Sequence, residues 1–163
     1  MATVALAPSM AARADRAAWL LLLGPATLLA GALGFQFLGG MHPCELCMWQ
    51  RWPHLATIVL ATAAFALPAA RKPLLIAAGI AVLTSAGIAV LHVGVEQHWW
   101  VGPTTCSATG VPKGDFLAGM LAAPLIRCDA AAWSAFGISM AGFNALLSTL
   151  IGLGGLRLLA RDR

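Results

Sequence analysis

Four long runs of apolar residues dominate this sequence, and they limit the folds that the chain can adopt. The runs cover residues 19–38, 53–70, 74–95 and 133–159. A helix of about 20 apolar residues is long enough to cross the hydrocarbon core of a bilayer. Apolar residues form 60% of the chain and charged residues only 10%, which leaves too little polar surface for a soluble domain. The sequence therefore predicts an all-α membrane protein, a four-transmembrane-helix bundle forming one integral membrane domain over residues 1–163.

Polar segments separate these predicted spans. Residues 39–52 follow the first span, and the longer segment 96–132 follows the third. Within the longer segment, residues 116–125 are mildly amphipathic, so we expect a short helix lying on the membrane surface there. We expect residues 1–16 to form a loose tail and Arg71-Lys72-Pro73 to form a short turn between the second and third spans.

The positions of the basic residues predict how the bundle is oriented. Seven of the ten Lys and Arg residues lie in the two tails and in the turn after the second span, and only Arg51, Lys113 and Arg127 lie in the two opposite loops. Because basic residues gather on the cytoplasmic side, we expect both termini in the cytoplasm and both loops outside. The net charge of +4 forms no patch with interleaved aromatic residues, so nucleic-acid binding is not expected. The first apolar run is too long for a cleaved signal peptide and is expected to be retained.

All four cysteines, Cys44, Cys47, Cys106 and Cys128, fall in the two outer loops. Cysteine is a common apolar filler, so its confinement to the side expected to be oxidising points to disulfides. Four cysteines permit three pairings. Local spacing favours a pair between Cys44 and Cys47, which leaves Cys106 and Cys128 as a longer-range pair.

The spacing of Cys44 and Cys47 is that of redox enzymes. A bridge over so short a stretch hardly restrains the unfolded chain, whereas a Cys-x-x-Cys pair can lower the pKa of one thiol and make it reactive. Purely structural bridges remain an alternative. A metal site that includes His42, His54 or His98 is another. The chain lacks the second closely spaced pair that zinc sites on this pattern usually have, so no metal is predicted.

Arg51 follows Cys47 by four residues, which would place both side chains on the same face of a helix. Its guanidinium could stabilise a thiolate or a carbonyl-bearing cofactor, although many arginines at span ends simply reach the headgroups. Gln50 could bind the same ligand or face water, and His92 is interpreted as an interfacial histidine. Polar residues of the fourth span are expected to hydrogen-bond to neighbouring helices. They are Ser139, Asn144, Ser148 and Thr149.

Two stretches resemble a known family. They are Pro43-Cys44-x-x-Cys47-x-Trp49-Gln50-Arg51-Trp52 and the run from Cys128-Asp129-x-x-x-Trp133 to Phe136-Gly137-Ile138-Ser139-Met140-Ala141-Gly142-Phe143-Asn144. Together with the four-span layout and a cysteine pair in each outer loop, they resemble the bacterial disulfide bond formation protein B (DsbB) family. The resemblance covers nearly all of the chain from residue 17 onward. Some members carry an acidic residue where this chain has Gln50.

The resemblance implies a thiol:quinone oxidoreductase of the bacterial inner membrane, with both cysteine loops in the periplasm. Its partners would be a periplasmic thioredoxin-like dithiol oxidase (DsbA-like) and a membrane quinone, either ubiquinone or menaquinone. Cys106 would form a mixed disulfide with the soluble partner, and electrons would pass from the pair of Cys106 and Cys128 to Cys44 and Cys47 through a transient inter-loop disulfide. Cys47 would be the thiolate beside the quinone, and Arg51 would lie at the quinone site.

Two other functions compete with this interpretation. A vitamin K epoxide reductase-like protein also uses a four-helix bundle and a quinone, but its quinone-facing Cys-x-x-Cys would be expected at the start of a late span. A non-enzymatic membrane protein with structural disulfides, acting as a scaffold or transporter, is the second. A transporter would more readily show charged or broken helices in mid-membrane, and this sequence has no such mid-span charge.

Overall fold

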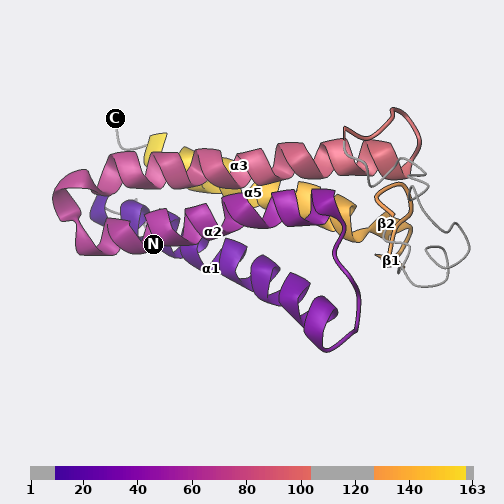
Figure 1. The fold of residues 1–163 in the computed structure, drawn as a ribbon. Helices are drawn as coiled ribbons and strands as arrows, with labels where there is room; N and C mark the ends of the chain where they lie inside the picture. The colour runs from indigo at the N-terminus through magenta and orange to yellow at the C-terminus, as the bar shows by residue number, and fades with distance from the viewer. Residues whose placement is uncertain (1–9, 104–126, 161–163) are drawn as a thin grey trace, which may run out of the picture.

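Four long helices form most of the chain in the computed structural model, which describes residues 10–103 and 127–160. The helices are α1 (Met10–Phe37), α2 (Glu45–Ala66), α3 (Arg71–Glu96) and α5 (Met140–Ala160). A 3-10 turn, Pro68–Ala70, joins α2 to α3. A small antiparallel hairpin of β1 (Ser134–Ala135) and β2 (Ile138–Ser139) precedes α5. Figure 1 shows the four helices packed as one elongated bundle.

The two ends of the bundle carry different parts of the chain (Figure 1). The start of α1, the end of α5 and the turn between α2 and α3 lie at one end. The hairpin and the segment between α1 and α2 lie at the other end, which we call the outer end. Cys44 precedes the first residue of α2 and is buried in one cluster with Cys128, so the first cysteine pair and Cys128 share the outer end, as the order of spans predicted.

Three of the described helices are long and apolar enough to cross a membrane. These segments are Ala12–Phe37, Pro68–Glu96 and Met140–Ala160. Helix α2 is not among them, because its first part carries Gln50, Arg51 and His54 before the apolar stretch begins. An all-α membrane protein is thus the class that the helices support, while a fourth membrane crossing by α2 stays a prediction.

At the opposite, inner end of the bundle, where α1 begins and α2 turns into α3, the helix bounds differ from those predicted. Helix α1 begins at Met10, inside the expected loose tail, and its Asp15 forms an ion pair with Arg71 at the start of α3. The stretch Arg71-Lys72-Pro73 is the first turn of α3 and not a connecting turn. Proline is tolerated there because the first N–H groups of a helix have no partner within the helix.

At the outer end, the observed first residues of α2 and α5 differ more from the predicted starts of the second and fourth spans. Helix α2 begins at Glu45 and not at residue 53, and α5 begins at Met140 and not at residue 133. The hairpin before α5 corrects the purely helical prediction. Its two turn residues, Phe136 and Gly137, have φ values of 53° and 78°, which is the conformation that two-residue hairpins favour.

Glycines allow α3 and α5 to pack closely. A Cβ atom added to Gly79 would lie 2.7 Å from Leu156, and one added to Gly152 would lie 2.6 Å from Leu83. Small residues let helix backbones approach in this way where the surrounding lipid supplies no hydrophobic driving force. These contacts join α3 and α5 along the part of the bundle away from its outer end.

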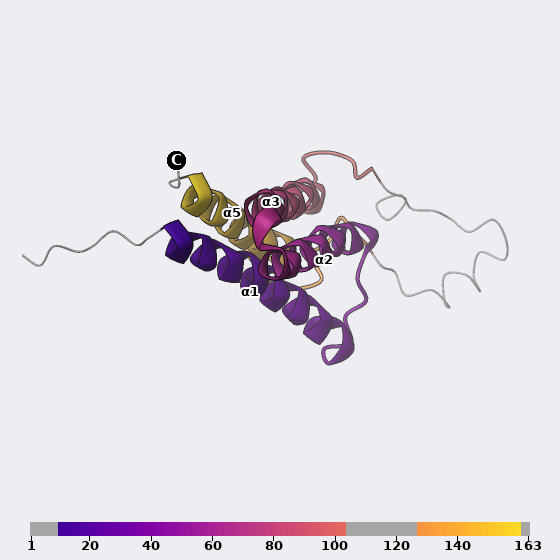
Figure 2. The ribbon, with the colours of Figure 1, turned by 90° about the vertical axis from the view of Figure 1, so that its left-hand side faces the viewer.

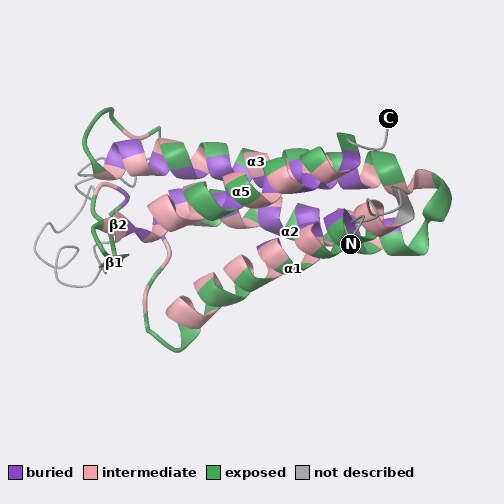
Figure 3. Ribbon diagram, turned by 180° about the vertical axis from the view of Figure 1, so that it is seen from behind, coloured by how far each residue is buried: buried purple, intermediate pink, exposed green. Residues whose placement is uncertain are grey.

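Helix α1 has fully buried residues only in about its first half. In Figures 1 and 2 its C-terminal half runs obliquely away from α2 and α5. Within the described part of α1, no residue after Pro25 is buried, whereas buried residues follow the inner faces of α2 and α3 along their length (Figure 3). The outer half of α1 therefore leaves space between itself and the rest of the bundle.

Candidate redox-active site

The first cysteine pair lies at the N-terminus of α2. Cys44 is the N-cap residue in an extended conformation, and its Sγ accepts the backbone N–H of Cys47 at 3.2 Å. The two Sγ atoms lie 2.6 Å apart, compared with about 2.05 Å in a disulfide bond. A small movement would therefore join the sulfurs, and the structure brings together the pair that spacing alone favoured.

The pKa values of the two thiols are shifted in opposite directions. The pKa of Cys47 is lowered to about 7, chiefly by the hydrogen bond from the Cys44 side chain, with further help from the backbone of Cys44 and the charge of Arg51. The pKa of Cys44 is raised, because its thiol donates that hydrogen bond and is buried. Cys47 is thus the member of the pair that exists as a thiolate near neutral pH.

Arg51 lies one turn beyond Cys47 on α2, as predicted. Its guanidinium donates to the side-chain oxygen of Gln36 and, at 3.4 Å, to the carbonyl oxygen of Ala32. Both partners belong to α1, so Arg51 spans the space between the two helices. Arg51 is half-buried and does not extend freely toward the surface.

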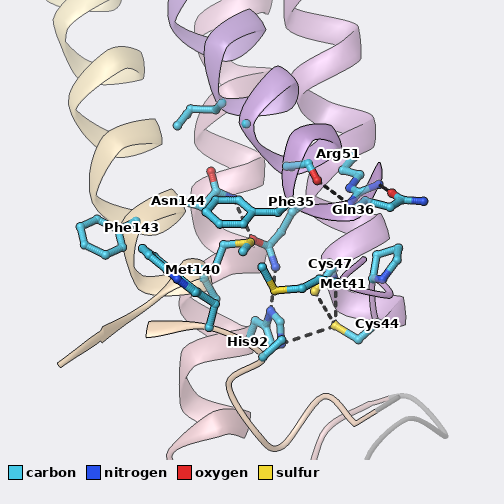
Figure 4. A pocket seen from close by; sticks show the side chains of 18 of the residues that line it. Phe35, Gln36, Met41, Cys44, Cys47, Arg51, His92, Met140, Phe143 and Asn144 are labelled. Atoms are coloured by element: carbon cyan, nitrogen blue, oxygen red, sulfur yellow. Dashed lines mark hydrogen bonds between the residues drawn. The ribbon is translucent and has the colours of Figure 1, made fainter. Parts of the chain in front are cut away.

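A cavity of about 640 Å³ occupies the space that the outer half of α1 leaves open. One face of α2 lines it with Cys47, Gln50, Arg51 and His54. Figure 4 shows Met140 and Phe143 of α5 across the pocket from Cys44 and Arg51. The larger apolar side chains of the lining are Phe35, Met41, Trp133, Met140, Phe143 and Leu147. A reactive thiol and a cation therefore face a largely apolar pocket.

Cys128 lies beside the first pair. It is fully buried in a cluster with Cys44, Leu46 and Val95. Two residues that the sequence separates widely, Cys44 and Cys128, thus meet at the outer end of the bundle. Cys106, its predicted bonding to Cys128, and the surface helix expected over residues 116–125 lie outside the described residues.

Sequence reasoning underestimated His92 and Gln50. His92 is buried, and its Nε2 lies 3.6 Å from Cys44 Sγ. Gln50 is also buried, with its side-chain amide 2.9 Å from His92 Nδ1, so the alternative that it faces water is wrong. A signal was present in the pattern, since Gln50 is within one turn of Cys47 and His92 is a rare polar residue of the third span.

The polar residues of α5 and its N-cap divide into two groups. Asn144 donates to Gln50 and Ser85, and Ser139 donates to Glu96, so these two residues do connect neighbouring elements. Ser148 instead donates to Asn144, and Thr149 donates to a carbonyl of its own helix. The prediction of contacts to neighbouring helices holds for the first two residues and is wrong for the last two.

The cysteine pair and His92 also form a possible donor set for a metal. The Sγ atoms of Cys44 and Cys47 and a ring nitrogen of His92 lie within 4.8 Å of one another. This set differs from the histidines considered from sequence. Two thiolates on one tetrahedral zinc ion lie about 3.8 Å apart, so the sulfurs as placed, 2.6 Å apart, do not fit that geometry.

Comparisons with known proteins identify the relatives of this chain. The family model described as "Disulfide bond formation protein DsbB" matches residues 14–157. Disulfide bond formation protein B of Methylococcus capsulatus is 35% identical over 143 residues, which cover 82% of this chain and 85% of the relative. Its namesake in Aromatoleum aromaticum is 30% identical over 158 residues, 88% of this chain and 93% of the relative. No solved structure gave a significant match.

The family match decides between the alternatives that the sequence left open. It favours an oxidoreductase of disulfide bond formation over a vitamin K epoxide reductase-like protein or a structural membrane protein. The apolar helices and the paired thiols at the outer end agree with it. The chain therefore belongs to the DsbB family of membrane proteins that act in disulfide bond formation.

Proposed function

We propose that this protein is a thiol:quinone oxidoreductase that reoxidises a periplasmic thioredoxin-like dithiol oxidase. The observation that carries the proposal is that Cys47, with its lowered pKa, and Arg51 face the same largely apolar cavity. A membrane-borne acceptor of two electrons needs an apolar route and a polar contact for its head group, and this cavity offers both. The family match supports the same chemistry.

The residues of the cavity fit a quinone. Arg51 would bind an oxygen on the ring and stabilise negative charge developing there, and it would also stabilise the thiolate of Cys47. Apolar side chains such as Phe35 and Phe143 would hold the ring and exclude water. A bound quinone would supply the final step by accepting two electrons and two protons, as the pair of Cys44 and Cys47 becomes a disulfide.

Electrons would reach this pair by thiol–disulfide exchange. A partner thiolate attacks Cys106 of the disulfide between Cys106 and Cys128, and Cys128 leaves as a thiolate. Cys128 then attacks Cys44 of the disulfide between Cys44 and Cys47, which releases Cys47 as a thiolate facing the cavity. The shared burial of Cys44 and Cys128 supports this second exchange.

Two further exchanges would release the oxidised partner and re-form the disulfide between Cys106 and Cys128. The second thiol of the partner attacks the mixed disulfide, so the partner leaves oxidised and Cys106 is released. Cys106 then attacks Cys128, which restores the second pair and frees Cys44. No metal takes part in these steps, since each exchange transfers an electron pair between sulfurs.

We further propose that the protein lies in the bacterial inner membrane with both termini in the cytoplasm and the outer end in the periplasm. The positions of the basic residues support this orientation. The proposed activity is tested by purifying the protein in a mild detergent and assaying it for bound quinone and for quinone reduction driven by a reduced DsbA-like protein. Quinone reduction that requires the partner would support the proposal, and its absence in a folded preparation would contradict it.

A further inference from the structure

The buried polar network beneath the thiols has fixed hydrogen-bond directions, and one backbone carbonyl sets the first of them. The side-chain nitrogen of Gln50 lies 3.1 Å from the carbonyl oxygen of Leu46, which can only accept. The amide group of Gln50 must therefore point its NH2 toward Leu46 and its oxygen away. That oxygen lies 2.7 Å from the side-chain nitrogen of Asn144, which donates to it.

The orientation of Asn144 is fixed by the same argument. Its NH2 donates to Gln50 and, at 3.2 Å, to Ser85, so its oxygen faces the other way. That oxygen accepts from Ser148 at 2.7 Å and from His54 Nε2 at 3.0 Å. Residues of α3 and α5 therefore hold the Gln50 amide in one orientation.

The orientation of Gln50 determines where His92 carries its proton. The second hydrogen of the Gln50 NH2 group points to His92 Nδ1, at 2.9 Å. Nδ1 must accept this hydrogen bond, so a neutral His92 carries its proton on Nε2. With the amide reversed, the Gln50 oxygen would face the Leu46 carbonyl, and two acceptors would be opposed.

The Nε2–H group of His92 faces both cysteine loops. Cys44 Sγ lies 3.6 Å from Nε2, within the range of hydrogen bonds to sulfur. The backbone of Cys128 also forms a hydrogen bond with the ring, and a ring whose Nδ1 is occupied can donate only through Nε2. The carboxylate of Glu96 is farther away, at 3.8 Å, and it accepts from Ser139.

We propose that Gln50 is a positioning residue that keeps the proton of His92 on Nε2, and that this N–H holds the Cys128 backbone beside Cys44 for exchange between the two loops. In that exchange the Cys128 thiolate attacks Cys44 Sγ. The bond between Cys44 and Cys47 breaks as the bond between Cys44 and Cys128 forms, and the electron pair leaves on Cys47. No other oxidant or proton is needed. The inference deepens the proposed function and rests on it for its biological meaning.

The test measures how fast Cys44 and Cys128 form a disulfide in the absence of a quinone reaction. In the full chain with Cys47→Ser and Cys106→Ser, only Cys44 and Cys128 can form a disulfide. The rate of its formation with diamide is followed by gel shift after labelling of the remaining thiols. Gln50→Leu should slow bond formation roughly tenfold, because both tautomers of His92 become accessible and the buried contact to Cys128 is lost.

Variants of His92 separate a hydrogen-bond role from a purely structural one. His92→Gln can place an NH2 group near the former Nε2 position and should retain much of the rate, whereas His92→Asn, whose amide reaches only the Nδ1 position, should be as slow as Gln50→Leu. In the His92→Gln background there is no tautomer to select, so Gln50→Leu should have little further effect. An equal slowing by Gln50→Leu in both backgrounds would overturn the proposal.

A matched control and a spectroscopic measurement complete the test. Thr57→Val removes a buried hydrogen bond from α2 to the Ala78 carbonyl on α3, away from the thiols, and should leave the rate within about twofold. Nitrogen-15 NMR of labelled histidine should show His92 protonated on Nε2. Protonation on Nδ1 would refute the proposal, as would unchanged bond formation in folded Gln50→Leu. Neither result depends on quinone reduction, so this inference can fail while the proposed function stands.

Discussion

The backbone N–H of Cys47 donates to the sulfur of Cys44, so the first turn of α2 is capped by the residue with which Cys47 would form a disulfide. The N-terminus of a helix also carries the positive end of the helix dipole, which favours a thiolate there. The two residues also share a hydrogen bond between their side chains, and this second contact is the main reason that the pKa of Cys47 is lowered.

The reactivity of Cys47 should follow its lowered pKa. In the reduced protein its rate of alkylation by iodoacetamide should reach half of its maximum near pH 7, because the thiolate that reacts becomes populated as the pH rises through that value. Arg51→Met should move the midpoint upward, since a charge that stabilises the thiolate is removed. A midpoint near the free-cysteine value of about 8.5 in the unmutated protein would contradict the assignment of Cys47 as the thiolate.

The capping role of Cys44 predicts a difference between two substitutions. Cys44→Ser keeps a side-chain acceptor for the Cys47 amide, whereas Cys44→Ala removes it and should cost about 1 kcal/mol. Thermal unfolding of the reduced proteins in detergent provides the measurement. Both variants lose the thiol, so equal stability would show that the contact does not cap α2.

Arg51 should matter for the acceptor and not for the fold. Arg51→Gln is expected to raise the quinone KM or lower turnover by about tenfold or more, because the charge facing the cavity is lost. Arg51→Lys keeps the charge but not the paired donors to α1, so its quinone kinetics should lie between those of Arg51→Gln and of the unmutated protein. An Arg51→Gln protein with native kinetics would exclude this residue from the quinone contact.

Close packing of α3 and α5 makes a further prediction. Gly152→Ala should destabilise the bundle by about 1 to 3 kcal/mol, because the new Cβ would meet Leu83 at 2.6 Å. Gly87→Ala is the matched control, since nothing lies within 4 Å of its added Cβ and alanine favours a helix. The two proteins are compared by thermal unfolding in the same detergent. Equal stability would mean that the contact at Gly152 relaxes without cost.

The sequence alone predicted the arrangement of the long helices and the cysteine segments. Apolar runs and turns determine which elements share an end of a bundle, and helical spacing places Arg51 on the face of Cys47. The start of α2 was missed because cysteine is not among the usual N-cap residues, so Cys44 gave no signal of a helix beginning at Glu45.

The role of His92 could not be predicted for a different reason. A histidine near the end of a span has the same sequence pattern whether it faces lipid, headgroups or a neighbouring helix. Only the packing of α2 on α3 brings Gln50 and Cys44 to its two ring nitrogens. Contacts between elements distant in the sequence decide which polar residues join the site, and spacing along one helix does not record them.

The central claim is that electrons leave this protein from Cys47 into a quinone. The direct measurement is the rate at which a reduced DsbA-like protein drives quinone reduction by the purified protein, compared with that of Cys47→Ser. The unmutated protein should form one quinol for each partner disulfide, and Cys47→Ser should form none above background while its fold is intact. Quinol formation by Cys47→Ser at the unmutated rate would contradict the account.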